Sequence, residues 1–534
     1  MRLKLIFILL LSVVNASADN YPRNEGIDIK HYTFRLELND STNILSGEAS
    51  IRLLVKKPFS EVAFDLVSEN RSRQGMQVAS VTMKNQSLPF RHANNRLLIT
   101  LPAAAAVNEE ITFTIRYSGT PADGLIISKN KFGDRTFFGD NWPDRARHWL
   151  PCIDHPYDKA SVDWIVLAPH HYAVVGNGYK VEESYLNPKQ KLTHWREEAD
   201  LPTKVMVIGA ARFAIRYERL VEGIPVSSWI YPQNREAGFS DYEPAARILE
   251  FFHQFIGPYS YPKLANVQST TRYGGMENAS NIFYYENSVT GRGQLENLIA
   301  HEIAHQWFGN SASEADWHHV WLSEGFATYF THVYTEFAHG KEKANQELSA
   351  ARNEVIAYNK RKPAPVINSG ITDYSALLTA DVYQRAGWVL HMLRKEMGDE
   401  AFFPAVRDYY QTYRNSNALT RDFQNIAEKH AGRKLDEFFN QWFYRATLPA
   451  LKTAWQYDAK TGLLTVTIDQ TQSGEPFYLS LGIGIRYGDS QPLQVENVTV
   501  TQKSQQFRFR TDGKPENVVP DPQTTLLFED ISRK

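Results

Sequence analysis

This chain of 534 residues has few of the features that mark a cross-linked, membrane-spanning or nucleic-acid-binding protein. Cys152 is its only cysteine, so no internal disulfide can form and packed cores alone must hold the fold. Its 58 basic and 60 acidic residues give a formal net charge of −2, which offers no indication of a nucleic-acid partner. Beyond the first eighteen residues, no apolar run is long enough to span a bilayer.

Those first eighteen residues, MRLKLIFILLLSVVNASA, predict a cleavable secretion signal. Arg2 and Lys4 form a basic start, residues 5–14 form an apolar core, and a small-residue cleavage site ends at Ala18. Because the core is too short to cross a bilayer, we expect no stable membrane span once the signal is removed; an uncleaved anchor is the alternative. An exported chain with a single cysteine is more typical of a bacterial periplasmic or secreted enzyme than of an animal ectodomain.

The periodicity of apolar residues divides the rest of the chain into three parts. Its length is too great for one core, and its content of 43% hydrophobic and 22% charged residues is ordinary for a globular protein. Residues 19–213 and 449–534 alternate apolar and polar side chains, which predicts strands, whereas residues 214–448 contain helical spacing, as in residues 241–255. We therefore expect a multidomain α+β protein with a large N-terminal β domain and a small C-terminal β-sandwich.

The most informative stretch is residues 294–330, QLENLIAHEIAHQWFGNSASEADWHHVWLSEGFATYF. It contains the H-E-x-x-H pattern at His301, Glu302 and His305. Residues four apart share a helix face, so the two imidazoles can bind one metal ion. Glu302 cannot join them as a ligand, which leaves it free to take a proton from a water that the metal activates.

A catalytic zinc ion needs three protein ligands and one open position. Glu324, separated from His305 by eighteen residues, is the candidate third ligand on a following helix. A bare H-E-x-x-H can also be an ordinary charged helix face. The apolar residues Leu298, Ile299, Ile303 and Trp307 argue against that reading, because they predict a buried helix on which unpaired charge would be costly.

With this spacing and the wording W-L-x-E-G-F-A around Glu324, the chain resembles the gluzincin M1 aminopeptidases. The resemblance implies a saddle-shaped N-terminal β domain over 19–213, a thermolysin-like catalytic domain over 214–448 and a β-sandwich over 449–534. It also implies one Zn²⁺ per chain, held by His301, His305 and Glu324. No residues remain for the long helical domain of larger members, so we expect a short form with a more open site.

The segment from Gly274 to Asn278 matches the family's G-x-M-E-N exopeptidase motif. Two glycines allow the backbone to pass close to a bulky group. Taken alone, however, a Gly-Gly pair is more simply interpreted as a surface hairpin. The resemblance implies that the backbone of Gly274 and Gly275 binds an extended peptide, and that Glu277 pairs with its free α-ammonium. Met276 and Asn278 complete this predicted substrate-binding segment.

The segment around Tyr383 resembles the family's Y-x-K-G stretch, with Arg385 and Ala386 replacing Lys and Gly. The resemblance implies that the Tyr383 hydroxyl donates to the oxyanion that develops during acyl transfer; mere packing is the alternative. In the first domain, Trp142 stands where many members carry Gln or Glu against the substrate amine, which leaves Asn141 or Asp140 as candidates for that contact.

The sequence thus predicts a zinc aminopeptidase acting on peptides with a free N-terminus, with Glu302 as general base. A gluzincin endopeptidase and a non-catalytic peptide-binding homologue remain as alternatives. A related enzyme opens a lipid epoxide at the same kind of zinc site. We interpret the adjacent His318 and His319 as structural or surface residues, since neighbours in sequence cannot share a helix face.

Overall fold

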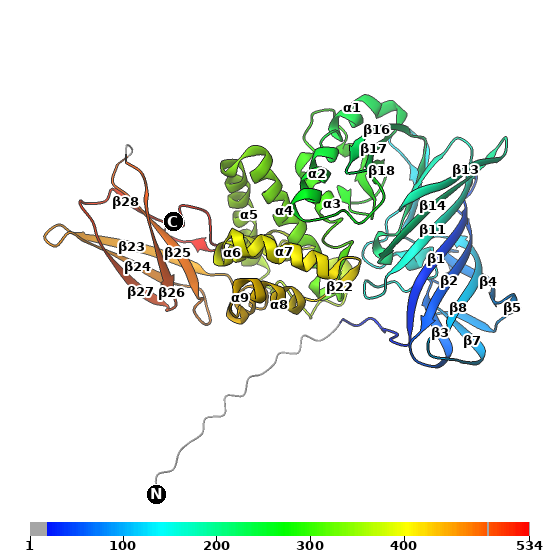
Figure 1. Ribbon diagram of the computed structural model, residues 1–534, viewed down its shortest axis with the longest axis horizontal. Helices are drawn as coiled ribbons and strands as arrows, with labels where there is room; N and C mark the ends of the chain where they lie inside the picture. The colour runs from blue at the N-terminus through cyan, green and yellow to red at the C-terminus, as the bar shows by residue number, and fades with distance from the viewer. Residues whose placement is uncertain (1–18, 489–490, 533–534) are drawn as a thin grey trace, which may run out of the picture.

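The structure is a computed structural model that describes residues 19–488 and 491–532; the predicted secretion signal lies outside this range. Three parts follow one another along the long axis of the molecule, with an N-terminal group of sheets, a central helical part and a C-terminal pair of sheets (Figure 1). This confirms the expected multidomain α+β class. None of the helices in the described part is both long enough and apolar enough to cross a membrane.

The largest N-terminal sheet has eight strands: β1 (Ile27–Glu37), β2 (Leu45–Val55), β4 (Gly75–Met83), β5 (Gln86–Ser87), β8 (Glu110–Thr120), β11 (Ala160–Pro169), β13 (Tyr179–Asn187) and β14 (Gln190–Leu201). Their order is β13-β14-β11-β1-β2-β8-β4-β5, and every pair is antiparallel except β1 with β11. Tyr32, Phe34 and Leu36 on β1 are all buried, so the period-two pattern does mark the inward face of a strand.

Two smaller sheets complete the N-terminal part. One has the order β3-β7-β6 and the other β12-β15-β10-β9. Their strands are β3 (Phe59–Asp65), β6 (Phe90–Ala93), β7 (Arg96–Ala105), β9 (Leu125–Lys129), β10 (Arg135–Gly139), β12 (Ala173–Gly176) and β15 (Ile208–Ala211).

The central part combines a five-stranded sheet with nine α-helices. The sheet has the order β16-β17-β18-β20-β19 and consists of β16 (Ala214–Val221), β17 (Ile224–Ile230), β18 (Leu264–Ser269), β19 (Gly275–Met276) and β20 (Asn281–Tyr285). The inner pairs β17–β18 and β18–β20 are parallel, and the very short β19 pairs antiparallel with β20. Because β19 is last in the order, one side of its backbone has no strand partner.

The helices are α1 (Arg235–Asp241), α2 (Ala245–Phe255), α3 (Glu296–Ala304), α4 (Trp321–His339), α5 (Lys341–Arg361), α6 (Ala386–Met397), α7 (Asp399–Tyr413), α8 (Thr420–Ala431) and α9 (Asp436–Phe443). The helical pattern expected over 241–255 is divided between α1 and α2, because α2 begins only after Pro244. Helix α3 contacts α4. The short strand β21 (Ala312–Glu314) also contacts α4 and pairs in parallel with β22 (Ser416–Ala418).

The C-terminal part has two sheets, in the orders β27-β24-β23-β29 and β26-β25-β28. Their strands are β23 (Ala450–Asp458), β24 (Leu463–Gln470), β25 (Leu479–Arg486), β26 (Gln494–Val500), β27 (Ser504–Arg510), β28 (Asn517–Pro520) and β29 (Glu529–Asp530). The alternating apolar residues of β24 and β25 are fully buried, as two packed sheets require: Leu464, Val466, Ile468, Leu479, Leu481, Ile483 and Ile485.

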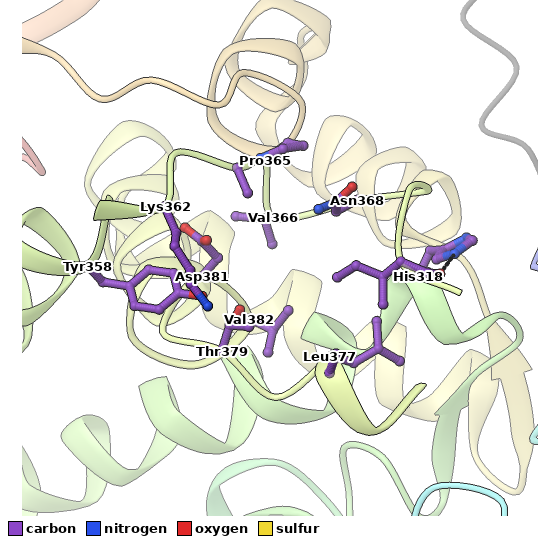
Figure 2. A pocket seen from close by; sticks show the side chains of 13 residues that line it. His318, Tyr358, Lys362, Pro365, Val366, Asn368, Leu377, Thr379, Asp381 and Val382 are labelled. Carbon is purple, nitrogen blue, oxygen red and sulfur yellow. Dashed lines mark hydrogen bonds between the residues drawn. The ribbon is translucent and has the colours of Figure 1, made fainter. Parts of the chain in front are cut away.

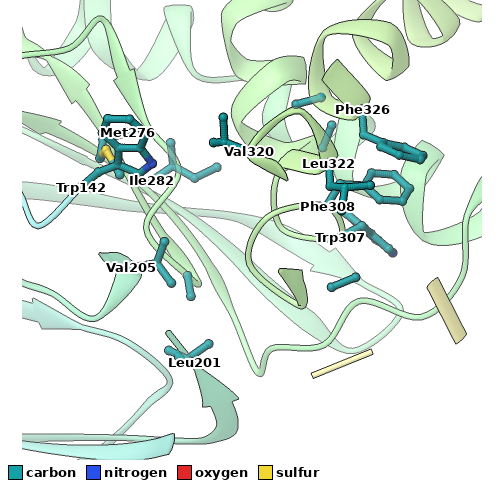
Figure 3. Close-up of a cluster of buried hydrophobic side chains, with 14 of the residues drawn as sticks. Trp142, Leu201, Val205, Met276, Ile282, Trp307, Phe308, Val320, Leu322 and Phe326 are labelled. Atoms are coloured by element: carbon teal, nitrogen blue, oxygen red, sulfur yellow. The ribbon is translucent and has the colours of Figure 1, made fainter. Parts of the chain in front are cut away.

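The apolar core is continuous from the N-terminal sheets into the central part. Figure 3 shows members of this cluster from both sides of the boundary, among them Trp142 and Val205 on one side and Met276 and Ile282 on the other. Close-packed interiors have low compressibility, so a displacement of one side chain is passed on to its neighbours. The N-terminal part can therefore fix the position of one wall of a site in the central part.

Candidate metal centre and active site

The H-E-x-x-H residues lie where α3 ends. His301 and Glu302 are in the helix, and His305 is the residue that follows its last position, with helical backbone angles (φ −57°, ψ −26°). The two histidines therefore share a face, as the spacing predicts. The chain then turns at Gly309, whose φ of 108° suits glycine, and a Cβ there would lie 2.1 Å from Oγ of Ser323.

Three side chains form a compact donor set. Nε2 of His301 lies 3.0 Å from Nε2 of His305, and Oε2 of Glu324 lies 3.5 Å and 3.2 Å from these two nitrogens. Zinc binds such atoms at about 2.0–2.2 Å, so a tetrahedral ion would hold its ligands about 3.3 Å apart. The three separations lie close to that value, so this donor set fits a zinc ion without rearrangement.

The ring of His305 is oriented by neighbouring groups. Its Nδ1 lies 3.2 Å from the carbonyl oxygen of Phe308 and 3.1 Å from Oγ of Ser323. A proton on Nδ1 donates to the carbonyl, which leaves the lone pair of Nε2 directed at the donor set.

The electrostatics of the centre favour a bound cation. Carboxylates of Glu277, Glu302 and Glu324 converge on the two imidazoles, and all three are at least 95% buried. Burial raises the pKa of Glu302 well above its usual range, and the charges of Glu277 and Glu324 add to this. Burial alone would lower the pKa of His305, but the nearby carboxylates raise it to about 10. A dication in the donor set would balance this surplus of negative charge.

Strand β19 passes directly beside Glu302. A Cβ on Gly275 would lie 2.2 Å from Oε1 of Glu302, whereas a Cβ on Gly274 would have no neighbouring atom within 4 Å. Only Gly275 is therefore needed for close approach. The carbonyl of Gly274 already accepts from the amide of Tyr285, so alternation along the strand turns the backbone groups of Gly275 to the unpaired edge.

Glu277 and Asn278 follow this strand. Oε1 of Glu277 is buried without a hydrogen-bond partner among the described residues, and one of its oxygens lies within 4.8 Å of ligand atoms of Glu302 and His305. Its backbone carbonyl accepts from Nε2 of Gln306 (2.7 Å) and Nδ2 of Asn310 (2.6 Å). The side chain of Asn278 is also buried, and neither of its polar atoms has a hydrogen-bond partner in the described part of the chain.

Tyr383 enters the site from one turn of π-helix, Asp381–Arg385, that leads into α6. Its ring stacks on His301 with centroids 5.9 Å apart and an interplanar angle of 20°. Burial raises its pKa well above 10, which keeps the hydroxyl protonated as a donor. Arg385 is fully buried and donates to the carbonyls of Ala364 and Arg445, so the replacement of Lys by Arg ties this turn to the chain around it.

A cavity of about 60 Å³ connects these groups; its lining is Trp142, Tyr273, Gly275, Met276, Glu277, His301, Glu302, His305, Glu324, Leu378 and Tyr383. Trp142 is thus the residue that the N-terminal part contributes. Asn141 does not face the cavity, because its amide donates to the carbonyls of Thr203 and Met206. Asp140 is fully buried and paired with Arg145.

A second cavity of about 200 Å³ is lined partly by the turn Asp381–Arg385 (Figure 2). Asp381 and Val382, from the turn that carries Tyr383, line it from one side and His318 from another. Nε2 of His318 bonds the carbonyl of Ile371, and Nδ1 of His319 bonds Oγ1 of Thr420. Both histidines have local partners away from the donor set, which agrees with a structural role.

Several positioning residues carry no signal in the sequence. Gln306 and Asn310 hold the Glu277 carbonyl, and Ser323 contacts the His305 ring, but none of them is unusual in type or spacing. A residue next to a ligand motif is a reasonable candidate for such a role, and that is the one signal that could have found Gln306.

Two family models match the chain. The peptidase M1 N-terminal domain matches residues 29–205, and the peptidase family M1 domain matches residues 240–442. Together they cover well over half of the sequence. The chain belongs to peptidase family M1. The cofactor of this M1 chain is Zn²⁺, and His301, His305 and Glu324 are a group of described side chains that could hold it.

Curated relatives are much longer than this chain. A protein named probable aminopeptidase 2 from Sulfurisphaera tokodaii is 25% identical, over 80% of this chain and 54% of its own length. Glutamyl aminopeptidase of Mus musculus is 22% identical, over 67% of this chain and 40% of its own length. The chain thus spans about half or less of the length of these relatives.

Solved structures match over more of their length. The M1 zinc metallopeptidase from Deinococcus radiodurans has a TM-score of 0.68 and 24% identity, over 79% of this chain and 95% of that one. A mutant of that enzyme bound to a Tyr-Ser-Ala substrate gives a TM-score of 0.67 and 23% identity, over 79% of this chain and 96% of that one. At these identities the likeness establishes the fold of this M1 chain.

Proposed function

We propose that this protein is a zinc-dependent aminopeptidase that removes the N-terminal residue from peptides. The observation that carries the proposal is the position of Glu277. Its Oε1 is buried without a hydrogen-bond partner among the described residues, and one of its carboxylate oxygens lies within 4.8 Å of ligand atoms of His305 and Glu302. An α-nitrogen is separated from the carbonyl carbon of its own residue by only two bonds of about 1.5 Å. An ammonium held by Glu277 therefore leaves room for one residue before the scissile bond.

The names of the relatives support this proposal. Sequence relatives of the chain carry aminopeptidase names, and the Deinococcus structure was solved with a tripeptide. The free N-terminus of the substrate is our inference from Glu277 alone.

The geometry supports the following roles for this chain's residues. Zinc, when bound, polarises the scissile carbonyl and lowers the pKa of water. Glu302 is placed to take the proton of the attacking water and to deliver it to the leaving amine. The Tyr383 hydroxyl donates a hydrogen bond to the developing oxyanion, while Gly275 presents its backbone groups to an added peptide strand.

The two alternatives make different predictions. A zinc endopeptidase would have no use for an unpaired carboxylate so close to the reacting centre. A non-catalytic binding protein would not require a carboxylate such as Glu302 packed closely against Gly275, or a tyrosine such as Tyr383 stacked on His301. We also propose, from the signal pattern of residues 1–18, that the enzyme is exported to the periplasm or the medium.

The test is hydrolysis of fluorogenic aminoacyl amides and of their N-acetylated forms by the zinc-loaded chain. We expect cleavage of free-amine substrates only. Glu302→Ala should abolish turnover, and Glu277→Ala should raise KM by about 10- to 100-fold, since a charge-assisted bond contributes about 1.5–3 kcal/mol. Equal cleavage of acetylated substrates would favour the endopeptidase, and bound zinc without turnover would favour the binding protein.

A further inference from the structure

The residue that follows the predicted cleavage site is built into the protein interior. Asp19 is 7% exposed, and its side chain is fully buried. Its backbone nitrogen donates to Oδ2 of Asp316 at 2.9 Å. Its own Oδ2 accepts from the amide of Trp317 at 3.0 Å and from Nε2 of His155 at 2.7 Å. Residues 316 and 317 are far away in sequence, so these contacts attach the start of the N-terminal part to the central part.

Carboxylates outnumber the cations in this cluster. Arg23 reaches Oδ2 of Asp316 (2.9 Å) and Oδ2 of Asp19 (3.5 Å), but its side chain is 29% exposed. Nδ1 of His155 accepts from the amide of Tyr157, so its Nε2 carries the single proton of a neutral ring. Burial lowers the pKa of His155, and this effect outweighs the hydrogen bond and charge of Asp19, which raise it.

The other oxygen of Asp316 faces a different group. Oδ1 accepts from the amide of His318 at 3.0 Å and lies 3.4 Å from Nδ1 of that ring. Oδ2 is therefore the oxygen that faces the nitrogen of Asp19. In the uncleaved chain this nitrogen is a neutral amide, and in a chain that begins at Asp19 it is an ammonium group.

The cluster lies next to the active-site cavity. Asp316 caps a short 3₁₀ turn, Trp317–His319, that leads directly into α4 and thus to the zinc ligand Glu324. The Trp317 ring packs edge-on against Trp142, a wall of the cavity, with centroids 5.7 Å apart. The Trp317 ring also stacks on Tyr374, with centroids 5.6 Å apart. Movement of this turn would shift both a cavity wall and the helix of a metal ligand.

We propose that hydrolysis of the Ala18–Asp19 bond creates a buried N-terminal ion pair with Asp316 that stabilises the active site. The C–N bond between Ala18 and Asp19 breaks, the oxygen of one water converts the Ala18 carbonyl into a carboxylate, and Asp19 gains an α-amino group that is protonated at neutral pH. The ammonium takes the place of the amide beside Oδ2 and neutralises a buried carboxylate. Removal of the signal is then a maturation step for the enzyme as well as for its export.

The test compares three zinc-loaded chains that differ only at the N-terminus: one beginning at Asp19, one with Ser-Gly before it, and one with an acetylated Asp19. We expect the free Asp19 chain to unfold at a temperature higher by about 1–3 °C and to have the highest kcat/KM. Equal unfolding temperatures and equal rates in all three would overturn the proposal and leave the peptidase function untouched.

A variant series separates charge from steric fit. In Asp316→Asn, the free and extended chains should unfold at the same temperature, because the anionic partner is gone. The matched control is Asp399→Asn, which removes the carboxylate of another arginine pair, with Arg394, and should leave the difference intact. A difference that survives in Asp316→Asn would be steric and would refute the ion pair. N-terminal sequencing of the exported protein should find Asp19, and any other first residue would refute the maturation step.

Discussion

Gly275→Ala is the sharpest single test of the active-site geometry. The new methyl group would lie 2.2 Å from Oε1 and 2.5 Å from Cδ of Glu302. Non-bonded carbon and oxygen atoms settle at about 3.5 Å, so either the carboxylate or the strand must move by about 1 Å. Glu302 is enclosed by α3 and β19, and a misplacement of about 1 Å in a reacting group costs roughly 10²-fold in rate.

We therefore expect Gly275→Ala to lower kcat by about 10²-fold, which corresponds to about 2.7 kcal/mol of barrier. The fold should lose only about 1–3 kcal/mol of stability, the usual cost of one extra methyl group in a packed place. Bound zinc should be unchanged, because His301, His305 and Glu324 are not the atoms that the methyl group meets.

The neighbouring glycine is the matched control. A Cβ on Gly274 meets nothing within 4 Å, and its φ is not in the left-handed region, so Gly274→Ala should keep kcat within about twofold. The assay is hydrolysis of a fluorogenic alanyl amide, with zinc content and thermal unfolding measured on the same samples. Wild-type kcat in Gly275→Ala, or an equal loss in Gly274→Ala, would refute the proposed contact with Glu302.

Three further predictions follow from individual side chains. Tyr383→Phe keeps the ring stacked on His301 but removes the hydroxyl donor, so kcat should fall about 10²- to 10³-fold with zinc content unchanged; a loss below fivefold would exclude the oxyanion role. Glu324→Gln should lose most of its zinc by atomic absorption and should no longer lose thermal stability when a chelator is added; full metal content would contradict its role as a ligand. Burial raises the pKa of Glu197 to about 7, so the folded chain holds a proton that the unfolded chain releases above about pH 4.5, and stability should fall as pH rises from 4.5 to 7. Glu197→Gln should flatten that fall in urea unfolding at pH 5 and pH 8.

The parts of the site that could be predicted from sequence are those set by local geometry. Residues four apart on a helix must share a face, so His301 and His305 converge wherever that helix lies. The fold class was equally accessible, because period-two and helical spacing directly report which faces are buried. The structure shows, in addition, that His305 lies just past the end of α3 and still keeps helical angles.

The parts that could not be predicted depend on contacts between distant segments. Trp142 reaches the cavity from the N-terminal sheets, whereas its neighbour Asn141 turns inward to bond backbone carbonyls more than sixty residues away. Nothing in the local pattern distinguishes these two adjacent residues. The contact of Asp19 with Asp316 spans 297 residues, and only the assembled structure brings the two together.

The exopeptidase specificity that we propose depends on the way that Glu277 is attached. Its backbone carbonyl accepts from the side-chain amides of Gln306, the residue directly after His305, and of Asn310. The backbone amide of Asn310 in turn donates to the His305 carbonyl. The proposed amine anchor, Glu277, and the proposed metal ligand, His305, are thus connected through the short segment from Gln306 to Asn310. In this proposal, loss of the Glu277 carboxylate removes the charge that recognises the substrate amine, whereas loss of the side-chain amide of Gln306 or Asn310 changes the distance between Glu277 and the metal. The first change should therefore weaken substrate binding, and the second should reduce the specificity for the first peptide bond of the substrate.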